Sequence, residues 1–403
     1  MRGFGLRNKG KRIAAIVAPV YVNGVGVLRE LARKGAHVVA ADTYRDSPGL
    51  HSRLAGEKVL VPPPDRDPGS FARYLLSRKD LYGGLVVPTD DFFVRELYDF
   101  RRELEGNFRL CISSGQAVEV FLDKARTAAA AAEAGIETPR TRVVSGEGDL
   151  EDAARYVGFP ALVKPVFSIS FKAKFGKKSF VARERDELGA AVKKAADAGE
   201  RIVIQEIIPG KDEDMATTVS YWNDAGGCAG EIEYRKVLQY PPFFGVGQLC
   251  RVARLPEVSA LARRLLERLS YGGAVAATEF KWDARDGSWK LIEVNVRTPM
   301  QSALLRRAGC DLIDMMWRDK LGLPQVPGGK VRAGFGWAHE KNAILRHRAY
   351  PDERPSFREY LKSYRPPIMP ALFELTDPGP FVADMWPLVK RRFSKKGEDA
   401  KEP

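Results

Sequence analysis

Short apolar strands alternate with helical segments over the first hundred residues, and this alternation restricts the fold more than any other feature of the chain. The predicted strands cover residues 12–17, 37–41 and 85–87. A helix is predicted over residues 27–34 and ends at Gly35, a residue type typical of helix C-termini. Strands separated by helices form parallel sheets with the helices packed on their faces. Ligands of such sheets bind at the carboxyl ends of the strands, where Asn23, Asp42 and Asp90 are expected.

The segment after the first strand contains Gly24 and Gly26, which match the start of a dinucleotide-binding fingerprint. The third glycine of that fingerprint is missing, because position 29 is Arg29. We therefore interpret residues 21–26 as a tight strand-to-helix turn rather than a phosphate site.

The chain has 403 residues, which is more than one ordinary hydrophobic core can organise. We predict four domains: residues 1–115, 116–210, 211–329 and 330–403. The first is Rossmann-like. The last is rich in proline and is interpreted as an appendage with a basic tail.

The composition, with 44% hydrophobic and 29% charged residues, is that of a globular protein and excludes collagen, mucin and extensive disorder. The four cysteines and four histidines lie far apart and show no ligand spacing, which argues against a zinc site or a disulfide framework. No stretch approaches the ~20 apolar residues that a transmembrane helix requires. The sequence therefore predicts a cytoplasmic protein without a transmembrane segment.

The chain is basic, with 65 Lys and Arg against 52 Asp and Glu and a net charge of +13. This excess favours anionic partners in general. Basic residues are spread along the whole sequence, and only residues 390–396 form a run. Because no basic motif is interleaved with aromatic residues, we prefer a solvated surface to a nucleic-acid groove and expect no specific nucleic-acid partner.

The middle of the chain has its own series of elements. Helices are predicted over residues 125–134, 187–198 and 258–269, and strands over residues 161–165, 180–182, 201–208, 274–282 and 289–296. The last two strands are joined by Asp286-Gly287, a strong hairpin signal.

The strand of this hairpin that runs from Lys290 carries the most informative pattern. Glu293, Asn295 and Arg297 alternate with apolar residues, so they face one side of the strand. Glu279, on the partner strand, brings a second carboxylate alongside them. Carboxylate and amide oxygens suit Mg²⁺, but the same residues also fit a surface ion-pair ladder, and the local pattern favours neither.

A lysine and a basic loop follow the strand at residues 161–165. Lys164 stands in an apolar strand, where a buried lysine is costly unless it meets an anion. The loop over residues 167–179 combines lysines and serines around Gly176 and suits a polyphosphate. A solvated loop is the alternative. Further along, Gln205-Glu206 ends a buried strand before Pro209-Gly210.

The order of these elements resembles the ATP-grasp superfamily over roughly residues 1–325. The motifs that carry the resemblance are Asp123-Lys124, Val163-Lys164-Pro165, the basic loop, Gln205-Glu206 with Pro209-Gly210, and the strand from Glu293 to Arg297. Residues 231–251 are similar to the carboxylate–amine ligases related to D-aspartate ligase. The resemblance implies a Rossmann-like pre-ATP-grasp domain followed by a two-lobed ATP-grasp fold, which is α/β and α+β.

The resemblance also implies the role of individual residues. The nucleotide would be held by Lys124, Lys164, Lys177, Lys178, Ser179, Gln205, Glu206, Ile207, Ile208 and Glu213. Lys124 and Lys164 would hold its phosphates, Glu206 and the backbone of Ile207 and Ile208 would frame the adenine, and Glu213 would bind the ribose. Metal ions would bind Glu279, Glu293 and Asn295, with two Mg²⁺ ions expected and Mn²⁺ as the alternative. Arg297 and Lys164 would be catalytic. The basic loop is rich in lysine and has a single glycine, Gly176, where many relatives have several glycines.

The implied activity is ATP-dependent amide formation through an acylphosphate, with a small-molecule carboxylate and an amine as substrates and a mobile loop at residues 167–179 as a lid. The candidate substrate residues are Tyr21, Asn23, Asp90, Asp91, Arg235 and Lys236. Asp90 and Asp91 could bind an ammonium group, or they could cap a helix N-terminus. Arg235 and Lys236 could bind a substrate carboxylate, or they could flank a solvated strand. The alternative functions are an ATP-grasp reaction on bicarbonate or a non-amine acceptor, and a nucleotide-responsive protein that binds RNA or anionic lipid. A homodimer is kept open.

Overall fold

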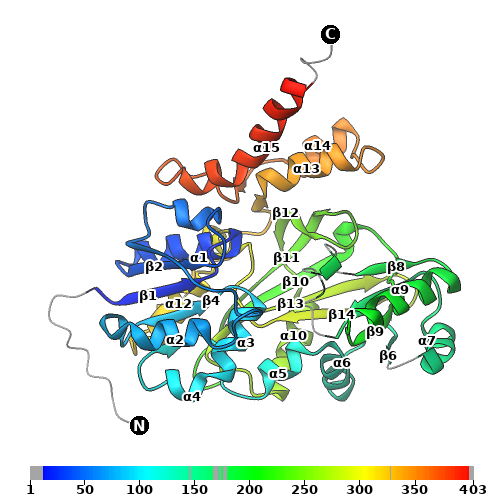
Figure 1. Cartoon of the computed structure of the whole chain (residues 1–403), viewed down its shortest axis with the longest axis horizontal. Helices are drawn as coiled ribbons and strands as arrows, with labels where there is room; N and C mark the ends of the chain where they lie inside the picture. Colours follow the sequence, from blue (N-terminus) through cyan, green and yellow to red (C-terminus); the bar gives the residue numbers. More distant parts are fainter. Residues whose placement is uncertain are drawn as a thin grey trace. The chain divides into compact units, whose positions relative to one another are not determined.

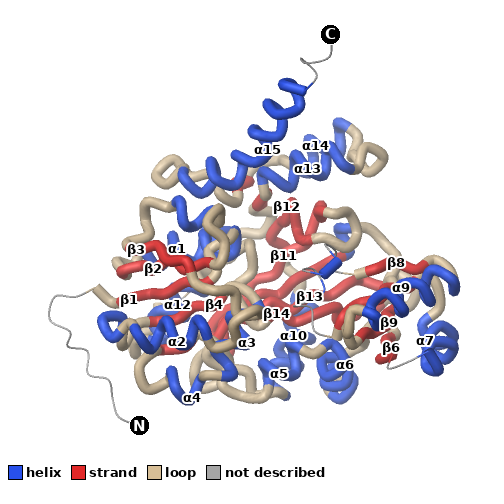
Figure 2. Tube along the Cα trace, in the orientation of Figure 1, coloured by secondary structure: helices blue, strands red, loops and turns tan. Residues whose placement is uncertain are grey.

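The computed structural model describes residues 12–144, 147–166, 171, 174–175, 179–326 and 328–398, without the side chains of residues 147 and 391–398. The chain forms two compact units (Figures 1 and 2). The first comprises residues 1–111, 237–252 and 298–403, and the second comprises residues 112–236 and 253–297. No described helix is long and apolar enough to cross a membrane.

The first unit is built around a five-stranded parallel sheet in the order β3-β2-β1-β4-β5. Its strands are β1 (Ala14–Ala18), β2 (His37–Asp42), β3 (Glu57–Leu60), β4 (Leu85–Pro88) and β5 (Arg109–Leu110). The central strands β1, β2 and β4 are buried almost throughout, because their residues are apolar on both faces. The parallel Rossmann-like sheet predicted from the sequence is confirmed.

Helix α1 (Val22–Arg33) begins five residues earlier than predicted, and residues 22–26 are helical rather than a turn. The two glycines permit close packing here. A Cβ atom on Gly24 would stand 2.3 Å from the carbonyl oxygen of Pro19, and one on Gly26 would stand 3.3 Å from Cβ of Ser302. The prediction was wrong because these glycines serve close approach of the helix to its neighbours rather than a positive φ.

The remaining helices of this N-terminal part are η1 (Pro48–His51), α2 (Ser70–Ser77), η2 (Lys79–Leu81), α3 (Asp91–Asp99) and α4 (Arg101–Leu104).

Chain segments from the C-terminal half complete the first unit. They contribute β12 (Val246–Ala253), β15 (Gly336–Ala338), β16 (Ile368–Pro370), α11 (Ser302–Arg307), α12 (Leu312–Lys320), α13 (Glu340–Ala349), α14 (Phe357–Ser363) and α15 (Gly379–Glu398). Strand β15 pairs antiparallel with β12 and parallel with β16.

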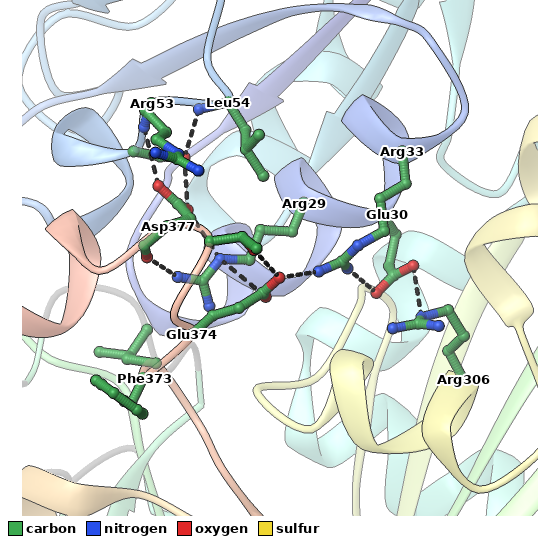
Figure 3. A network of polar contacts seen from close by, with 12 residues as sticks. Arg29, Glu30, Arg33, Arg53, Leu54, Arg306, Phe373, Glu374 and Asp377 are labelled. Carbon is green, nitrogen blue, oxygen red and sulfur yellow. Dashed lines mark hydrogen bonds and ion pairs between the residues drawn. The ribbon is translucent and has the colours of Figure 1, made fainter.

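Buried ion pairs fix the C-terminal segment to the N-terminal helix (Figure 3). The Nε atom of Arg29 lies 2.9 Å from Oδ2 of Asp377, and its Nη2 donates to the Asp377 carbonyl. Arg33 bridges Glu30 and Glu374, and Glu30 also pairs with Arg306. Asp377 is fully buried and accepts a hydrogen bond from Ser52. The segment interpreted as an appendage therefore shares a buried polar network with residues from the start of the chain.

The second unit has two lobes. The first lobe is a sheet in the order β6-β9-β7-β8 with antiparallel neighbours. Its elements are β6 (Thr141–Val144), η3 (Glu147–Asp149), α7 (Leu150–Val157), β7 (Ala161–Pro165), β8 (Phe180–Ala182), α9 (Arg185–Asp197) and β9 (Ile202–Glu206). Apolar residues of α7 and α9 pack with those of the strands in a single core.

The second lobe is an antiparallel sheet in which β14, β13, β10 and β11 are neighbours in that order. Its elements are α5 (Ala117–Leu122), α6 (Lys124–Glu133), η4 (Asp212–Asp214), β10 (Met215–Trp222), β11 (Cys228–Tyr240), α10 (Pro256–Arg268), β13 (Ala274–Asp283) and β14 (Ser288–Asn295). The hairpin predicted from Asp286-Gly287 is confirmed as β13 and β14.

Candidate active site

The hairpin brings together the acidic residues that the sequence places on one face. Glu279 of β13 lies directly opposite Glu293 of β14 in the register. Asn295 donates from Nδ2 to Oε1 of Glu293 at 3.1 Å, and Arg297 donates from Nη2 to Oδ1 of Asn295 at 3.0 Å. Val294, between them, is buried on the opposite face. Two carboxylates, an amide and a guanidinium therefore form one polar row.

Across the sheet, this row continues onto β10. Thr217 pairs with Glu279 in the register, so the two side chains share a face. The Oγ1 atom of Thr217 is buried, and no hydrogen-bond partner for it occurs among the described residues. A buried hydroxyl without a partner costs about 1–3 kcal/mol. A ligand or water held at this face would remove that cost.

A buried lysine occupies the position beside the first carboxylate. The Nζ atom of Lys236, on β11, lies 2.5 Å from Oε2 of Glu279, and the side chains of the two residues are only 7% and 13% exposed. Lys236 is one of the candidate substrate residues. In the structure it pairs with a carboxylate of the protein itself, and a contact with substrate stays a prediction.

A second buried lysine on the same face was missed by the sequence reasoning. Lys281 lies two residues beyond Glu279 and donates from Nζ to the carbonyl oxygens of Gly210 and Lys211, at 3.2 and 3.1 Å. Burial lowers the pKa of Lys281, against the opposing effect of nearby Asp214 and Asp212. The period-two alternation that identified Glu279 also places Lys281 on this face, so the signal was present in the sequence.

The lysine predicted to bind phosphate lies on the first lobe. Lys164 of β7 donates from Nζ to Oε1 of Gln205 on β9 at 2.7 Å. Gln205 in turn donates from Nε2 to Thr141 Oγ1 at 3.1 Å. This chain of hydrogen bonds orients the ammonium group, because each amide atom of Gln205 has a defined partner. Gln205 therefore orients Lys164, and a contact of Gln205 with the nucleotide stays a prediction.

The other predicted phosphate residues are placed less completely. Lys124 is the first residue of α6, whose N-terminus is capped by Asp123 through hydrogen bonds from the backbone N–H groups of Ala125 and Arg126. Ser179 precedes β8. Lys177 and Lys178, and most of the predicted lid over residues 167–179, lie outside the described residues.

Glu206 is occupied by two arginines. Its carboxylate accepts from Arg140 at 3.0 and 3.2 Å and pairs with Arg285 at 2.7 Å. Burial alone would raise the pKa of Glu206, but the hydrogen bonds from Arg140 and Arg285 hold it below its usual value. Arg285 also binds Asp283 at 2.6 Å, so the network fastens the hairpin to the end of β9. The carboxylate of Glu206 is therefore engaged within the protein.

The segment after β9 leads to the residue expected at the ribose. Ile207 and Ile208 follow the strand, with Ile208 buried, and Glu213 lies in η4 with its side chain exposed. The carbonyl of Glu213 accepts from Nη1 of Arg235 at 3.0 Å, and the guanidinium of Arg235 lies 5.4 Å from the centroid of the Trp289 ring. Arg235 therefore connects η4 to the hairpin, and a substrate contact stays a prediction.

The substrate residues predicted in the first unit lie at the carboxyl ends of β1 and β4. Asn23 donates from Nδ2 to the carbonyl of Thr89 at 2.9 Å. Asp90 is the N-cap of α3 and accepts from the backbone N–H of Phe93, which agrees with the capping alternative, and Asp91 is the first residue of that helix. Burial of the Tyr21 hydroxyl raises its pKa to about 12, and Asp384 acts in the same direction.

Residues 121–220 match the model of the RimK-like ATP-grasp domain. The chain therefore contains a region that matches an ATP-grasp domain. Among curated proteins it is 23% identical to D-aspartate ligase of Enterococcus faecium over 293 residues, which cover 68% of each chain. It is 27% identical to the formate-dependent phosphoribosylglycinamide formyltransferase of Salmonella typhimurium over 232 residues. That match covers 56% of this chain and spans 55% of the length of the formyltransferase.

The fold is shared with solved ATP-grasp structures. The biotin carboxylase domain of Hydrogenobacter thermophilus 2-oxoglutarate carboxylase, solved with MgADP and bicarbonate, superimposes with a TM-score of 0.64 at 16% identity. The likeness covers 80% of this chain and 73% of that domain. The predicted fold class, an α/β domain followed by a two-lobed ATP-grasp fold, is confirmed, and the proteins that this chain resembles are enzymes.

Proposed function

We propose that this protein is an ATP-dependent carboxylate–amine ligase that forms an amide bond and releases ADP and phosphate. The observation that carries the proposal is the polar row on the hairpin, where Glu279 faces Glu293 and Asn295 connects Glu293 to Arg297. An ATP-grasp fold supplies the nucleotide site, and the row supplies the charges that phosphoryl transfer requires.

The residues of the row fit Mg²⁺. The donors are hard oxygens, and Mg²⁺ is usually bound in proteins by one or two carboxylates together with substrate phosphates. The ammonium group of Lys236, 2.5 Å from Glu279, shows that a cation is accommodated beside this carboxylate. Within the described ranges, no three His, Cys, Asp or Glu side chains gather as a metal cluster. The ion would therefore rely on Glu279, Glu293 and Asn295, and it would neutralise charge on the phosphate oxygens.

The proposed chemistry balances without a further reactant. A substrate carboxylate oxygen attacks the γ-phosphorus of ATP, the bond to the β,γ-bridging oxygen breaks, and ADP leaves. The amine then attacks the carbonyl carbon of the acylphosphate, phosphate leaves, and the amine proton passes to solvent. Both steps place negative charge on phosphoryl oxygens, so catalysis depends on positioning and on fixed cations.

We propose that two cationic side chains neutralise the negative charge on the phosphoryl oxygens. Arg297 is held in place through its hydrogen bond to Asn295, and Lys164 through its hydrogen bond to Gln205. These hydrogen bonds orient the two cationic groups, and in the proposed reaction both groups act on the bound anion. Losing one such charge typically lowers turnover by about 10²–10³-fold.

The substrate class is proposed from the relatives. D-aspartate ligase is named for an amino-acid substrate, and this chain covers 68% of it. We therefore propose an amino acid as the carboxylate or the amine. We also propose a reducing cytoplasmic setting, which is supported by the four cysteines, all of them free thiols.

The deciding experiment is to incubate the purified protein with ATP, Mg²⁺ and an amino-acid library, and to follow ADP release and products by mass spectrometry. An ADP-coupled condensation product, smaller by one water than its two substrates, is expected. ATP with bicarbonate is the parallel reaction, because the structural relative was solved with bicarbonate. ADP release with bicarbonate alone would replace the ligase proposal, and no substrate-dependent ADP release in either reaction would contradict both.

A further inference from the structure

Exposed apolar side chains concentrate near the C-terminus of the first unit. Among the described residues, eight of the seventeen exposed large hydrophobic side chains lie between residues 357 and 389. They are Phe357, Tyr360, Leu361, Phe373, Leu375, Val382, Trp386 and Val389. Such a concentration is unusual for a solvated surface, where exposed apolar side chains are ordinarily scattered.

The clearest part of this surface is one stripe along α15, the red helix in Figure 1. Val382, Trp386 and Val389 are 55%, 60% and 40% exposed. With 3.6 residues in each turn, these three positions fall within about 60° of one another on the helix. We call these three side chains the α15 stripe.

The opposite side of α15 is packed, so the direction of the stripe is fixed within the unit. Asp384 is buried and pairs with Lys341 at 2.9 Å and with Nε2 of His339 at 3.3 Å. A Cβ atom on Gly379 would stand 2.0 Å from the carbonyl of His51, so the helix begins directly against η1. The helix therefore cannot turn its stripe inward without breaking these contacts.

The neighbouring segments extend the apolar surface. Leu375, just before the helix, is 84% exposed, and Phe373 packs edge-on against Phe381 of α15 at 5.3 Å between ring centroids. Helix α14 has a defined start, a capping box between Ser356 and Glu359, yet none of its residues is buried.

We propose that the α15 stripe and the basic run that follows it dock the protein on an anionic lipid surface. The sequence Lys390-Arg391-Arg392 and Lys395-Lys396 places five basic residues within seven positions directly after the stripe. Tryptophan and aliphatic side chains beside a lysine- and arginine-rich segment are the combination found in helices that lie at membrane interfaces.

Two other partners could cover such a surface, a second copy of this chain or a nucleic acid, but charge and side-chain type favour lipid over both. A second copy of this chain would bring the same basic run to the contact, and the whole chain carries +13, so self-association there is opposed by like charges. Nucleic acid would use the basic run and Trp386, but the valines of the stripe and Leu375 neither stack on bases nor bind phosphate.

The test is sedimentation of the full chain with vesicles of phosphatidylcholine alone or with 30% phosphatidylglycerol, at low and at high salt, without nucleotide. Binding is expected only to the anionic vesicles and should weaken with salt. Because Trp386 is the most exposed of the tryptophans, its fluorescence should shift to the blue on binding.

Two sets of variants separate the contributions. The substitution Lys390→Gln with Arg391→Gln and Arg392→Gln should weaken binding about a hundredfold, at about fivefold for each charge. The substitution Val382→Ser with Trp386→Ser and Val389→Ser should remove binding and the fluorescence shift. The matched control is Tyr44→Ser, which alters a side chain that is 71% exposed outside the surface.

Three outcomes would overturn the proposal. The first is that the unaltered protein stays in the supernatant with anionic vesicles at low salt. The second is that the stripe variant, with an unchanged melting temperature, binds as well as the unaltered protein. The third is that the stripe variant instead abolishes a dimer in sedimentation velocity or binding to a homopolymeric RNA. Because nucleotide is omitted, none of these results depends on the ligase proposal.

Discussion

Glu206 and Glu279 are two largely buried carboxylates of the same unit, and each is paired with basic side chains. The two residues differ in the type of basic side chain that they meet. Glu206 is held by the guanidinium groups of Arg140 and Arg285, with contacts to both carboxylate oxygens. Glu279 meets one lysine, Lys236, at a single oxygen. Guanidinium groups match a carboxylate with several fixed donors, whereas an ammonium group is a point charge on a flexible stem.

The difference distinguishes a structural carboxylate from an exchangeable one. Of the two arginines of Glu206, Arg140 directly precedes β6 and Arg285 lies in the hairpin turn, so their contacts with Glu206 link these segments to the end of β9. We expect Lys236, which carries its charge on a flexible side chain, to give way to a divalent cation more readily than the two arginines would. The type of basic partner, rather than burial, is therefore our reason for proposing Glu279 and not Glu206 as the metal ligand.

The largest effect is expected at the hairpin row. Glu293→Gln and Arg297→Ala should each reduce ATP-dependent amide formation by about 10²–10³-fold. The first weakens the proposed Mg²⁺ site and the second removes a cation, so in both variants negative charge on the transferred phosphoryl group is less well neutralised. ADP release and product are measured together with the melting temperature, which should stay within about 2 °C. Near-normal turnover in either variant would remove that residue from the site.

Glu206→Gln should lower the free energy of unfolding by about 2 kcal/mol, the contribution of a hydrogen-bonded charge. Turnover of the folded fraction should fall much less than in Glu293→Gln. Urea titrations and initial rates give the two quantities. If the pattern is reversed, with full stability and lost turnover, Glu206 is a ligand residue and the distinction drawn above is wrong.

The loss of stability caused by Glu206→Gln should depend on pH. Because the folded protein lowers the pKa of Glu206, its ionised form stabilises the fold above the unfolded pKa, near 4.3. That contribution is lost as the pH falls through the folded value. The stability difference between the unaltered protein and Glu206→Gln should therefore be constant from pH 7 to 5 and shrink below pH 4. A difference that grows on acidification would contradict the assignment.

Lys236→Met should tighten Mn²⁺ binding in the absence of nucleotide roughly tenfold, because the lysine no longer competes for Glu279. Free Mn²⁺ can be followed by electron paramagnetic resonance. Lys281→Met is the matched control, since Lys281 binds carbonyl oxygens rather than a carboxylate and its loss should leave the metal affinity unchanged. Equal effects of the two variants would show that general charge, not the pair with Glu279, sets the affinity.

The smallest effect is expected in the first unit, where Asp90 is either a structural helix cap or a substrate-binding carboxylate. Asp90→Ala should cost about 1 kcal/mol of stability, the usual contribution of a helix N-cap, and leave the KM for both substrates unchanged. Asp91→Ala should cost less stability, because Asp91 is not the cap. A raised KM in Asp90→Ala would place its carboxylate at a substrate ammonium group.

Much of this architecture follows from local sequence signals. The hairpin turn at Asp286-Gly287 and the alternation through Glu293 predict both strands and their polar face, because period two is a property of any extended chain. The same reasoning could not assign partners. Whether Lys236 meets a substrate or Glu279, and whether Glu206 meets adenine or Arg285, depends on strand order and on residues about 40 to 80 positions away.

The predicted start of helix α1 was wrong because it was inferred from the usual preference of glycine for turns, whereas close packing explains these glycines. Gly24 and Gly26 suggested a turn, but they lie inside α1, where their missing side chains leave room for Pro19 and Ser302. The C-terminal segment was equally hard to place, because Asp377 finds Arg29 only after the chain has returned over more than three hundred residues. Such contacts carry no local pattern.

The division of the chain into two units has a consequence for its biogenesis. The backbone passes between them after residues 111, 236, 252 and 297. The strands of the N-terminal sheet are therefore translated well before Asp377 and the other residues that complete their unit. Domains generally fold as units during synthesis. This unit cannot be completed until Asp377, 348 residues after Arg29, has been translated.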